Sequence, residues 1–169
     1  IPKDGVTAKD IILHLISKHG ANGANGHAIE FQGETIDRMS IESRLTLCNM
    51  AVEFGAMTGI ISPDKKTIEY ISGKAFAPEK GDQKLAEEYW ASLKSDDGAH
   101  FSKVIDIDAS KLNTYVTWGT SPEHAIEIKD KIPSIDDANS SKENTSIKKA
   151  LDYMGLEEND GIRGTKIDA

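Results

Sequence analysis

The chain has one cysteine, no cluster of basic residues and no long apolar run among its 169 residues. With Cys48 alone no disulfide framework can form, which is typical of a reducing compartment, so we expect a cytoplasmic protein. The 20 Lys and Arg residues are outnumbered by 28 Asp and Glu residues, and the formal net charge of -8 argues against a nucleic-acid partner. No stretch has the length and apolar character of a membrane span, so we expect no membrane partner either.

What the chain does have is enough apolar residues, 38% of the total, for the core of one domain, and we interpret 1–169 as a single unit. The hydrophobic periodicity predicts an α/β fold, with helices flanking a mixed sheet. The predicted helices cover 7–19, 40–54, 64–71, 82–94 and 145–154. The predicted strands cover 27–31, 57–61, 104–107, 115–118 and 125–128, with 57–61 expected to be buried. A segment rich in Ser, Asp, Asn and Lys at about 133–144 predicts an exposed loop.

A narrow polar line runs along the otherwise apolar segment 40–54. Glu42, Thr46, Asn49 and Glu53 are spaced at i, i+4, i+7 and i+11, so a helix projects all four from one face. A carboxylate and a carboxamide one turn apart could position a proton or a ligand if that face lines a cleft. The alternative is the solvated edge of a surface helix, and periodicity alone favours that alternative.

Several motifs follow one another along the chain. Segment 27–33 reads His-Ala-Ile-Glu-Phe-Gln-Gly, 44–56 reads Arg-Leu-Thr-Leu-Cys-Asn-Met-Ala-Val-Glu-Phe-Gly-Ala, and 59–64 reads Gly-Ile-Ile-Ser-Pro-Asp. Val-Thr-Trp-Gly-Thr-Ser-Pro follows at 116–122 and Lys-Ala-Leu-Asp-Tyr-Met-Gly-Leu at 149–156. Together these segments resemble the aconitase superfamily, and the last two resemble its 3-isopropylmalate dehydratase large-subunit branch. The resemblance covers nearly the whole chain and implies an aconitase-like layered domain.

The resemblance also implies an activity that the chain cannot perform alone. Members of that branch are hydro-lyases that isomerise 2-isopropylmalate to 3-isopropylmalate in leucine biosynthesis, with a 4Fe-4S cluster held by three cysteines and a separate small subunit that completes the site. One thiolate cannot hold such a cluster. The resemblance implies that the ligands follow a segment like 165–168, and that the family's histidine-rich and aspartate-rich motifs precede Ile1. We therefore interpret the chain as the middle portion of a large subunit, inactive alone and without metal ligands of its own.

Two residues of this chain match active-site positions of the family. Asn49 matches an asparagine close to the cluster, and Glu53 matches a glutamate that pairs with a histidine from another domain. In the family that pair helps to protonate the departing hydroxyl. Both are catalytic candidates, and Asn49 is also the candidate for contact with the cofactor. None of the five histidines matches the partner, and we interpret each as a surface or packing residue.

Three further residues have two interpretations each. Cys48 is a reactive thiol beside Asn49 or an inert packing residue, and packing is favoured for an isolated cysteine. Arg44 grips a substrate carboxylate or forms a structural ion pair, and its place opposite the polar line favours the ion pair. Trp118 belongs to the core or to a contact between domains. For the chain as a whole the alternatives are homoaconitase, an aconitase-like hydratase, or a cluster-free binding or assembly module.

Overall fold

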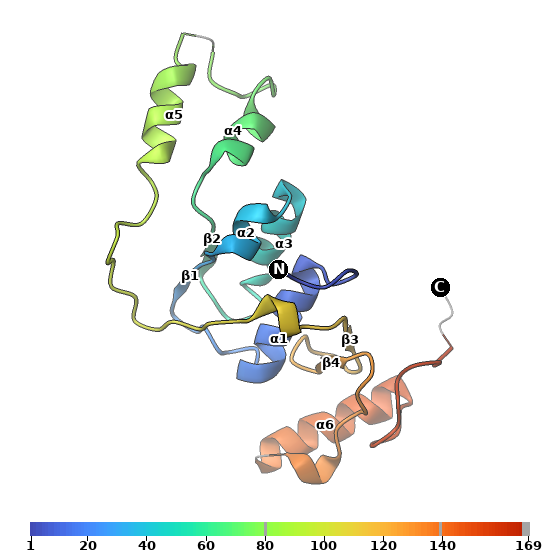
Figure 1. Cartoon of the computed structure of the whole chain (residues 1–169). Coiled ribbons are helices and arrows are strands. Elements are labelled where there is room, and N and C mark those ends of the chain that lie inside the picture. Colours follow the sequence, from blue (N-terminus) through green and yellow to red (C-terminus); the bar gives the residue numbers. More distant parts are fainter. Residues whose placement is uncertain (80, 139, 167–169) are drawn as a thin grey trace.

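The computed structural model describes residues 1–79, 81–138 and 140–166, and it combines helices with short strands (Figure 1). The α/β class predicted from the sequence is confirmed. The helices are α1 (Ala8–His19), α2 (Glu34–Arg38), α3 (Ile41–Met50), α4 (Lys65–Ile71), α5 (Gln83–Ala91) and α6 (Ser141–Met154), with short 3-10 turns η1 (Ala109–Lys111) and η2 (Ile135–Asp137). The strands are β1 (Ala28–Glu30), β2 (Thr58–Ile60), β3 (Tyr115–Thr117) and β4 (Ala125–Glu127).

The strands of the described residues form two separate pairs. β1 and β2 run parallel, with Ile29 opposite Gly59, and are joined through α2 and α3. β3 and β4 run antiparallel as a hairpin, with Val116 opposite Ile126. The parallel and antiparallel pairings expected of a mixed sheet are therefore both present, but they lie in two ribbons.

Helix α1 starts where the sequence predicts and is tied to the hairpin by a buried carboxylate. The main-chain N–H and the hydroxyl of Thr7 both donate to Asp10 Oδ2, each at 2.7 Å, and this pair caps the helix. Asp10 Oδ1 accepts from the main-chain N–H of Tyr115 at 2.6 Å. One side chain thus starts the helix and fixes β3 against it.

Two apolar clusters hold the described residues together. The larger joins α1, α3 and the parallel strands, and its most buried large side chains are Ile12, Ile16, Leu47 and Phe54. The smaller joins the hairpin and α6 around Trp118, which is only 3% exposed. Trp118 is therefore a core residue, the first of its two predicted roles.

Most of the middle of the chain lies outside both clusters, although Ile61 and Ile107, both only partly buried, pack against the larger one. No described residue from 57 to 108 is buried. Helix α5 extends away from the rest of the molecule (Figure 1), whereas the start of α4 is held to α2, since Lys66 Nζ donates to Asp37 O at 2.6 Å. Both helices were predicted, but the apolar face of α5 is open to solvent, with Leu85 69% and Tyr89 63% exposed. We call the segment between residues 62 and 95, which contains α4 and α5, the excursion. Its two ends meet at Glu30, whose carboxylate accepts hydrogen bonds from the hydroxyls of Ser62 at 3.2 Å and Ser95 at 2.6 Å.

Three predictions about this middle region and the loop after it were wrong. Strand β2 is not buried, because no described element covers its outer side and Ile60 is 49% exposed. Segment 101–107, which we call the strap, contains the predicted strand 104–107 but forms no strand. It has no regular secondary structure, with a bend at Ser102, and it pairs with no described strand. The predicted loop at 133–144 ends early, because the Ser140 hydroxyl accepts from the N–H of Glu143 and starts α6 at Ser141. Asn139 of that loop and residues 167–168 of the tail motif lie outside the described residues.

Gly59 allows β2 to approach α3 closely. A Cβ at this position would lie 2.8 Å from the Cβ of Ala51 and 2.9 Å from the main-chain oxygen of Cys48. We expect Gly59→Ala to lower the free energy of unfolding by about 1–3 kcal/mol, because the rigid helix backbone must move to admit the methyl group. Urea unfolding checks this, with Gly161→Ala as the control because a Cβ there meets nothing within 4 Å. Equal stability of the two variants would contradict the close contact.

Candidate functional site

The candidate site lies on α3 and the turn that follows it. The helix starts at Ile41 because the hydroxyl of Ser40 accepts from the N–H of Ser43 at 3.3 Å. Regular helix ends at Met50, four residues short of the predicted end at 54. The chain keeps winding through a Schellman turn, in which Ala56 N–H donates to Ala51 O at 3.0 Å and Gly55 N–H donates to Val52 O at 2.9 Å.

Gly55 makes this turn possible. Its φ of +90° belongs to the left-handed region, and a Cβ would lie 2.9 Å from the main-chain oxygen of Ala21. The turn therefore fixes the position of Glu53 one helical turn after Asn49.

Asn49 and Glu53 both lie on the exposed face of this segment. Neither side chain makes a hydrogen bond or an ion pair with any described residue. Their neighbours on the same face, at helical spacing, include Leu45 and Val52, which are 49% and 62% exposed. The sequence placed those two residues on an apolar side of the helix; the structure instead mixes them with the polar pair on an open surface.

The first half of the polar line is engaged with its own helix. The hydroxyl of Thr46 donates to the main-chain oxygen of Glu42 at 3.0 Å, one turn earlier. Hydrogen bonds from its own main chain and from Ser40 are the largest causes that lower the pKa of the Glu42 carboxyl. Of the four residues on the line, Asn49 and Glu53 therefore have the polar groups most available to a ligand or to another polypeptide.

Arg44 forms the structural ion pair that the sequence favoured. It is only 5% exposed, and its Nη2 lies 2.6 Å from Asp64 Oδ2. The same guanidinium donates to the main-chain oxygens of Ile36 at 3.2 Å and Asp37 at 3.0 Å. The hydrogen bond from Arg44 is the largest cause that holds the pKa of Asp64 well below its usual range. Arg44 thus joins α2, α3 and the start of α4, and it has no donor directed to the Asn49 and Glu53 face.

Cys48 alone does not have the properties of a ligand to an iron-sulfur cluster. It is half-buried, and burial raises the pKa of its thiol, which favours the unreactive protonated form. Among the described residues no three His, Cys, Asp or Glu side chains come together in a way that could hold a metal ion. A 4Fe-4S cluster needs several thiolates, so the residues present here cannot bind one on their own.

The histidines occupy packing or surface positions. His14 Nδ1 lies 2.7 Å from the hydroxyl of Tyr115, and His124 stacks on Trp118 with ring centroids 4.7 Å apart. Burial lowers the pKa of both imidazoles. His27 Nδ1 lies 2.9 Å from the main-chain oxygen of Asn25, two residues away. These contacts agree with the interpretation of His14 and His124 as packing residues.

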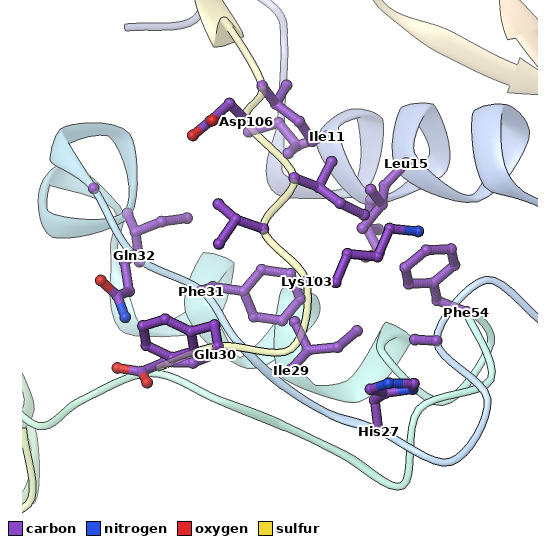
Figure 2. A pocket seen from close by; sticks show the side chains of 18 of the residues that line it. Ile11, Leu15, His27, Ile29, Glu30, Phe31, Gln32, Phe54, Lys103 and Asp106 are labelled. Carbon is purple, nitrogen blue, oxygen red and sulfur yellow. The ribbon is translucent and has the colours of Figure 1, made fainter. Parts of the chain in front are cut away.

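The structure contains a cavity that was not predicted from the sequence. It has a volume of about 630 Å³ and lies between α1, β1 and the strap (Figure 2). Its walls come from segments more than 60 residues apart in the chain, such as Ile29 and Val104, so no local motif could mark it. Phe54 lines it, but Asn49 and Glu53 do not.

Comparisons with known proteins agree on one family. The sequence matches the aconitase family (aconitate hydratase) over residues 2–169. The 3-isopropylmalate dehydratase large subunits of Campylobacter jejuni subsp. jejuni strains 81116 and 81-176 are each 48% identical to it over 164 residues. The match covers 97% of this chain and 35% of each relative, so the chain spans about a third of their length. No helix in the described part of the chain is long and apolar enough to cross a membrane.

The chain belongs to the aconitase family. Within that family it is similar to the large subunit of 3-isopropylmalate dehydratase, as the motifs at 44–56, 116–122 and 149–156 indicated.

The Arg44–Asp64 pair predicts a pH dependence. Because the pKa of Asp64 is depressed below its ordinary value of 3.8, the pair stabilises the fold above that pH and the contribution is lost as the pH falls further. We expect Asp64→Asn to be less stable than the wild type at neutral pH, and the difference to shrink below about pH 4. Urea unfolding at several pH values measures it, with Glu69→Gln, an exposed carboxylate on α4, as the control. A difference independent of pH would contradict the pairing.

Proposed function

We propose that this chain is part of the large subunit of a 3-isopropylmalate dehydratase, a hydro-lyase that converts 2-isopropylmalate to 3-isopropylmalate by removing water and adding it back. The observation that carries the proposal is the 48% identity over nearly the whole chain to proteins of that name. The exposed pair Asn49 and Glu53 supports it, since catalytic groups supplied by one domain of a larger enzyme are expected at an open face. In the complete enzyme the reaction would belong to leucine biosynthesis in the cytoplasm.

Glu53 is the proposed positioning carboxylate. A carboxylate that accepts a hydrogen bond from an imidazole N–H fixes the tautomer and stabilises the charged form, which allows the ring to deliver a proton to a departing hydroxyl. None of the histidines in the described residues has its ring nitrogens bonded to Glu53. The partner imidazole is therefore assigned to another part of the longer polypeptide.

Asn49 is the proposed neighbour of the 4Fe-4S cluster. Its carboxamide can both donate and accept hydrogen bonds, and it lies one turn before Glu53 on the same face. The cluster thiolates are assigned to the rest of the polypeptide, since the residues here do not fit that role. A small subunit is the proposed partner that completes the site.

Two other assignments follow from different observations. Homoaconitase and aconitase-like hydratases share the aconitase family, and the match to that family alone does not separate them from the dehydratase. A cluster-free binding module is supported by the open apolar face of α5. The identity to the dehydratase large subunits favours the first assignment over both.

The isolated chain is expected to be inactive. After reconstitution with iron and sulfide it should develop no visible cluster absorption, and it should not hydrate isopropylmaleate, because one cysteine cannot hold the cluster. Absorption spectroscopy and a hydration assay check both statements. Turnover by the isolated chain would overturn the assignment of the cluster ligands to another part of the polypeptide.

Glu53 can be tested in the complete large subunit mixed with its small subunit. We expect Glu53→Gln to lower kcat by about 100-fold, the typical loss when acid–base assistance is removed, while the cluster absorption is retained. Glu42→Gln, on the same face about three turns earlier, is the matched control and should keep its rate. If both variants turn over 2-isopropylmalate like the wild type, the polar line is a solvated helix edge and not a site.

A further inference from the structure

The strap makes no hydrogen bond with any described residue. From residue 101 to 107 the chain has no regular secondary structure, and neither its main chain nor its side chains find a hydrogen-bonding partner within the described part of the protein. Val104, Ile105 and Ile107 are β-branched, a composition typical of strands. Val104 is 67% and Ile105 36% exposed. The segment thus has the sequence of a strand and lacks a strand to pair with.

The outer edge of β1, on the side away from β2, also lacks a strand to pair with. Phe31 N–H donates to Ile60 O at 2.9 Å, and His27 O accepts from Met57 N–H at 2.8 Å, both toward the β2 side. Because successive residues of a strand direct their main-chain groups to opposite edges, Ala28 and Glu30 direct theirs away from β2. β1 and β2 form a sheet of two strands, so no described strand meets that edge.

These two unpaired segments line one cavity. The cavity has a volume of about 630 Å³ and is bounded by the strap, by β1 and by α1 (Figure 2). Its walls are largely apolar, with Ile11, Leu15, Ile29, Phe31 and Phe54 among the residues that line it. Unpaired main-chain groups beside an apolar surface are costly, and an exposed strand edge of this kind is a template for pairing.

We propose that the cavity accepts an extended, mainly apolar peptide segment, which adds to the outer edge of β1 as a strand and is covered by the strap. This mode of recognition uses main-chain hydrogen bonds for affinity and apolar pockets for alternate side chains. An apolar small molecule would fill the cavity but would leave the N–H and C=O groups of β1 unpaired. A peptide strand satisfies both the apolar walls and the main-chain groups.

The occupant is a strand of the polypeptide that completes the longer subunit. The relatives are about three times as long as the segment this chain matches, so most of such a polypeptide lies outside the 169 residues. This choice of donor rests on the proposed function; the acceptor groove itself does not. Insertion would join β1, the donor strand and the strap, and would bury apolar side chains of the strap that are exposed here.

The probe is a soluble peptide of seven alternating Thr, Val and Ile residues with one Lys at each end. The control peptide has the same charges but carries proline at alternate positions, which removes main-chain donors. Amide hydrogen exchange of the 1–169 chain is followed by NMR. We expect the first peptide to slow exchange at the outer edge of β1 and in the strap by about tenfold or more, since paired amides exchange only on opening. The control peptide should slow neither.

Variants of the strap test the main-chain contacts. Successive amides point to opposite sides of an extended segment, so either Val104→Pro or Ile105→Pro removes a donor that the bound strand needs. We expect one of the two to weaken peptide binding by about fivefold to tenfold, the worth of a hydrogen bond. Ile105→Ala keeps its N–H and should lose less. Circular dichroism of each free variant checks that the fold is retained, which the lack of hydrogen bonds in the strap leads us to expect.

Three results would overturn the proposal. The strap amides could be protected without any peptide, which would mean that the strap pairs with β1 by itself. The peptide could bind without protecting β1, which would mean only apolar association. It could also fail to bind at all. None of these results bears on the hydro-lyase assignment, which the Glu53→Gln assay tests separately in the complete enzyme.

Discussion

The guanidinium of Arg44 is the contact on which the arrangement of the first half of the chain depends. It joins three successive segments through one planar group: the main-chain oxygens that end α2, the helix α3 that carries it, and the carboxylate that caps α4. Asp64 in turn accepts from the N–H of Thr67 at 3.0 Å, so the ion pair also starts a helix. A lysine at position 44 has no fork of donors and could not reach all of these acceptors at once.

Helix α3 packs against the protein with one side only, which leaves its opposite side exposed to solvent. Arg44, Leu47, Ala51 and Phe54 face the protein, at spacings of three and four residues that follow one side of the winding. Asn49 and Glu53 are directed to the opposite side, with the Schellman turn at Gly55 fixing the end of the segment. The helix is held firmly by one side, so the other can present two polar groups to a second body without needing its own internal contacts.

The sequence predicted local structure well wherever the signal was local. The start of α1 near residue 7, the end of α6 at 154, the hairpin strands and the ion-pair role of Arg44 all depend on residues close in the chain or on one helix face. The larger errors concern pairing and burial. Two helix ends were also misplaced, since α3 ends at Met50 and α6 starts at Ser141. Val104 and Ile107 have strand propensity, but a strand requires a neighbour, which no property of the segment itself supplies. Ile60 was expected to be buried because it is apolar, although burial depends on what other segments cover. The resemblance singled out Asn49 and Glu53, whereas the cavity beside β1 became visible only in three dimensions.

Glu30 gives the excursion through α4 and α5 a property of its own. By accepting hydrogen bonds from Ser62 and Ser95, it brings together the points where the chain leaves and returns, so the 32 residues between them form a closed loop on a fixed base. The entropy of closing such a loop grows only slowly with its length. Residues can therefore be added to or removed from this region during evolution at little cost to the core. The region in which no described residue is buried is thus the part most free to diverge, while the surface around Asn49 and Glu53 stays bound to a rigid frame.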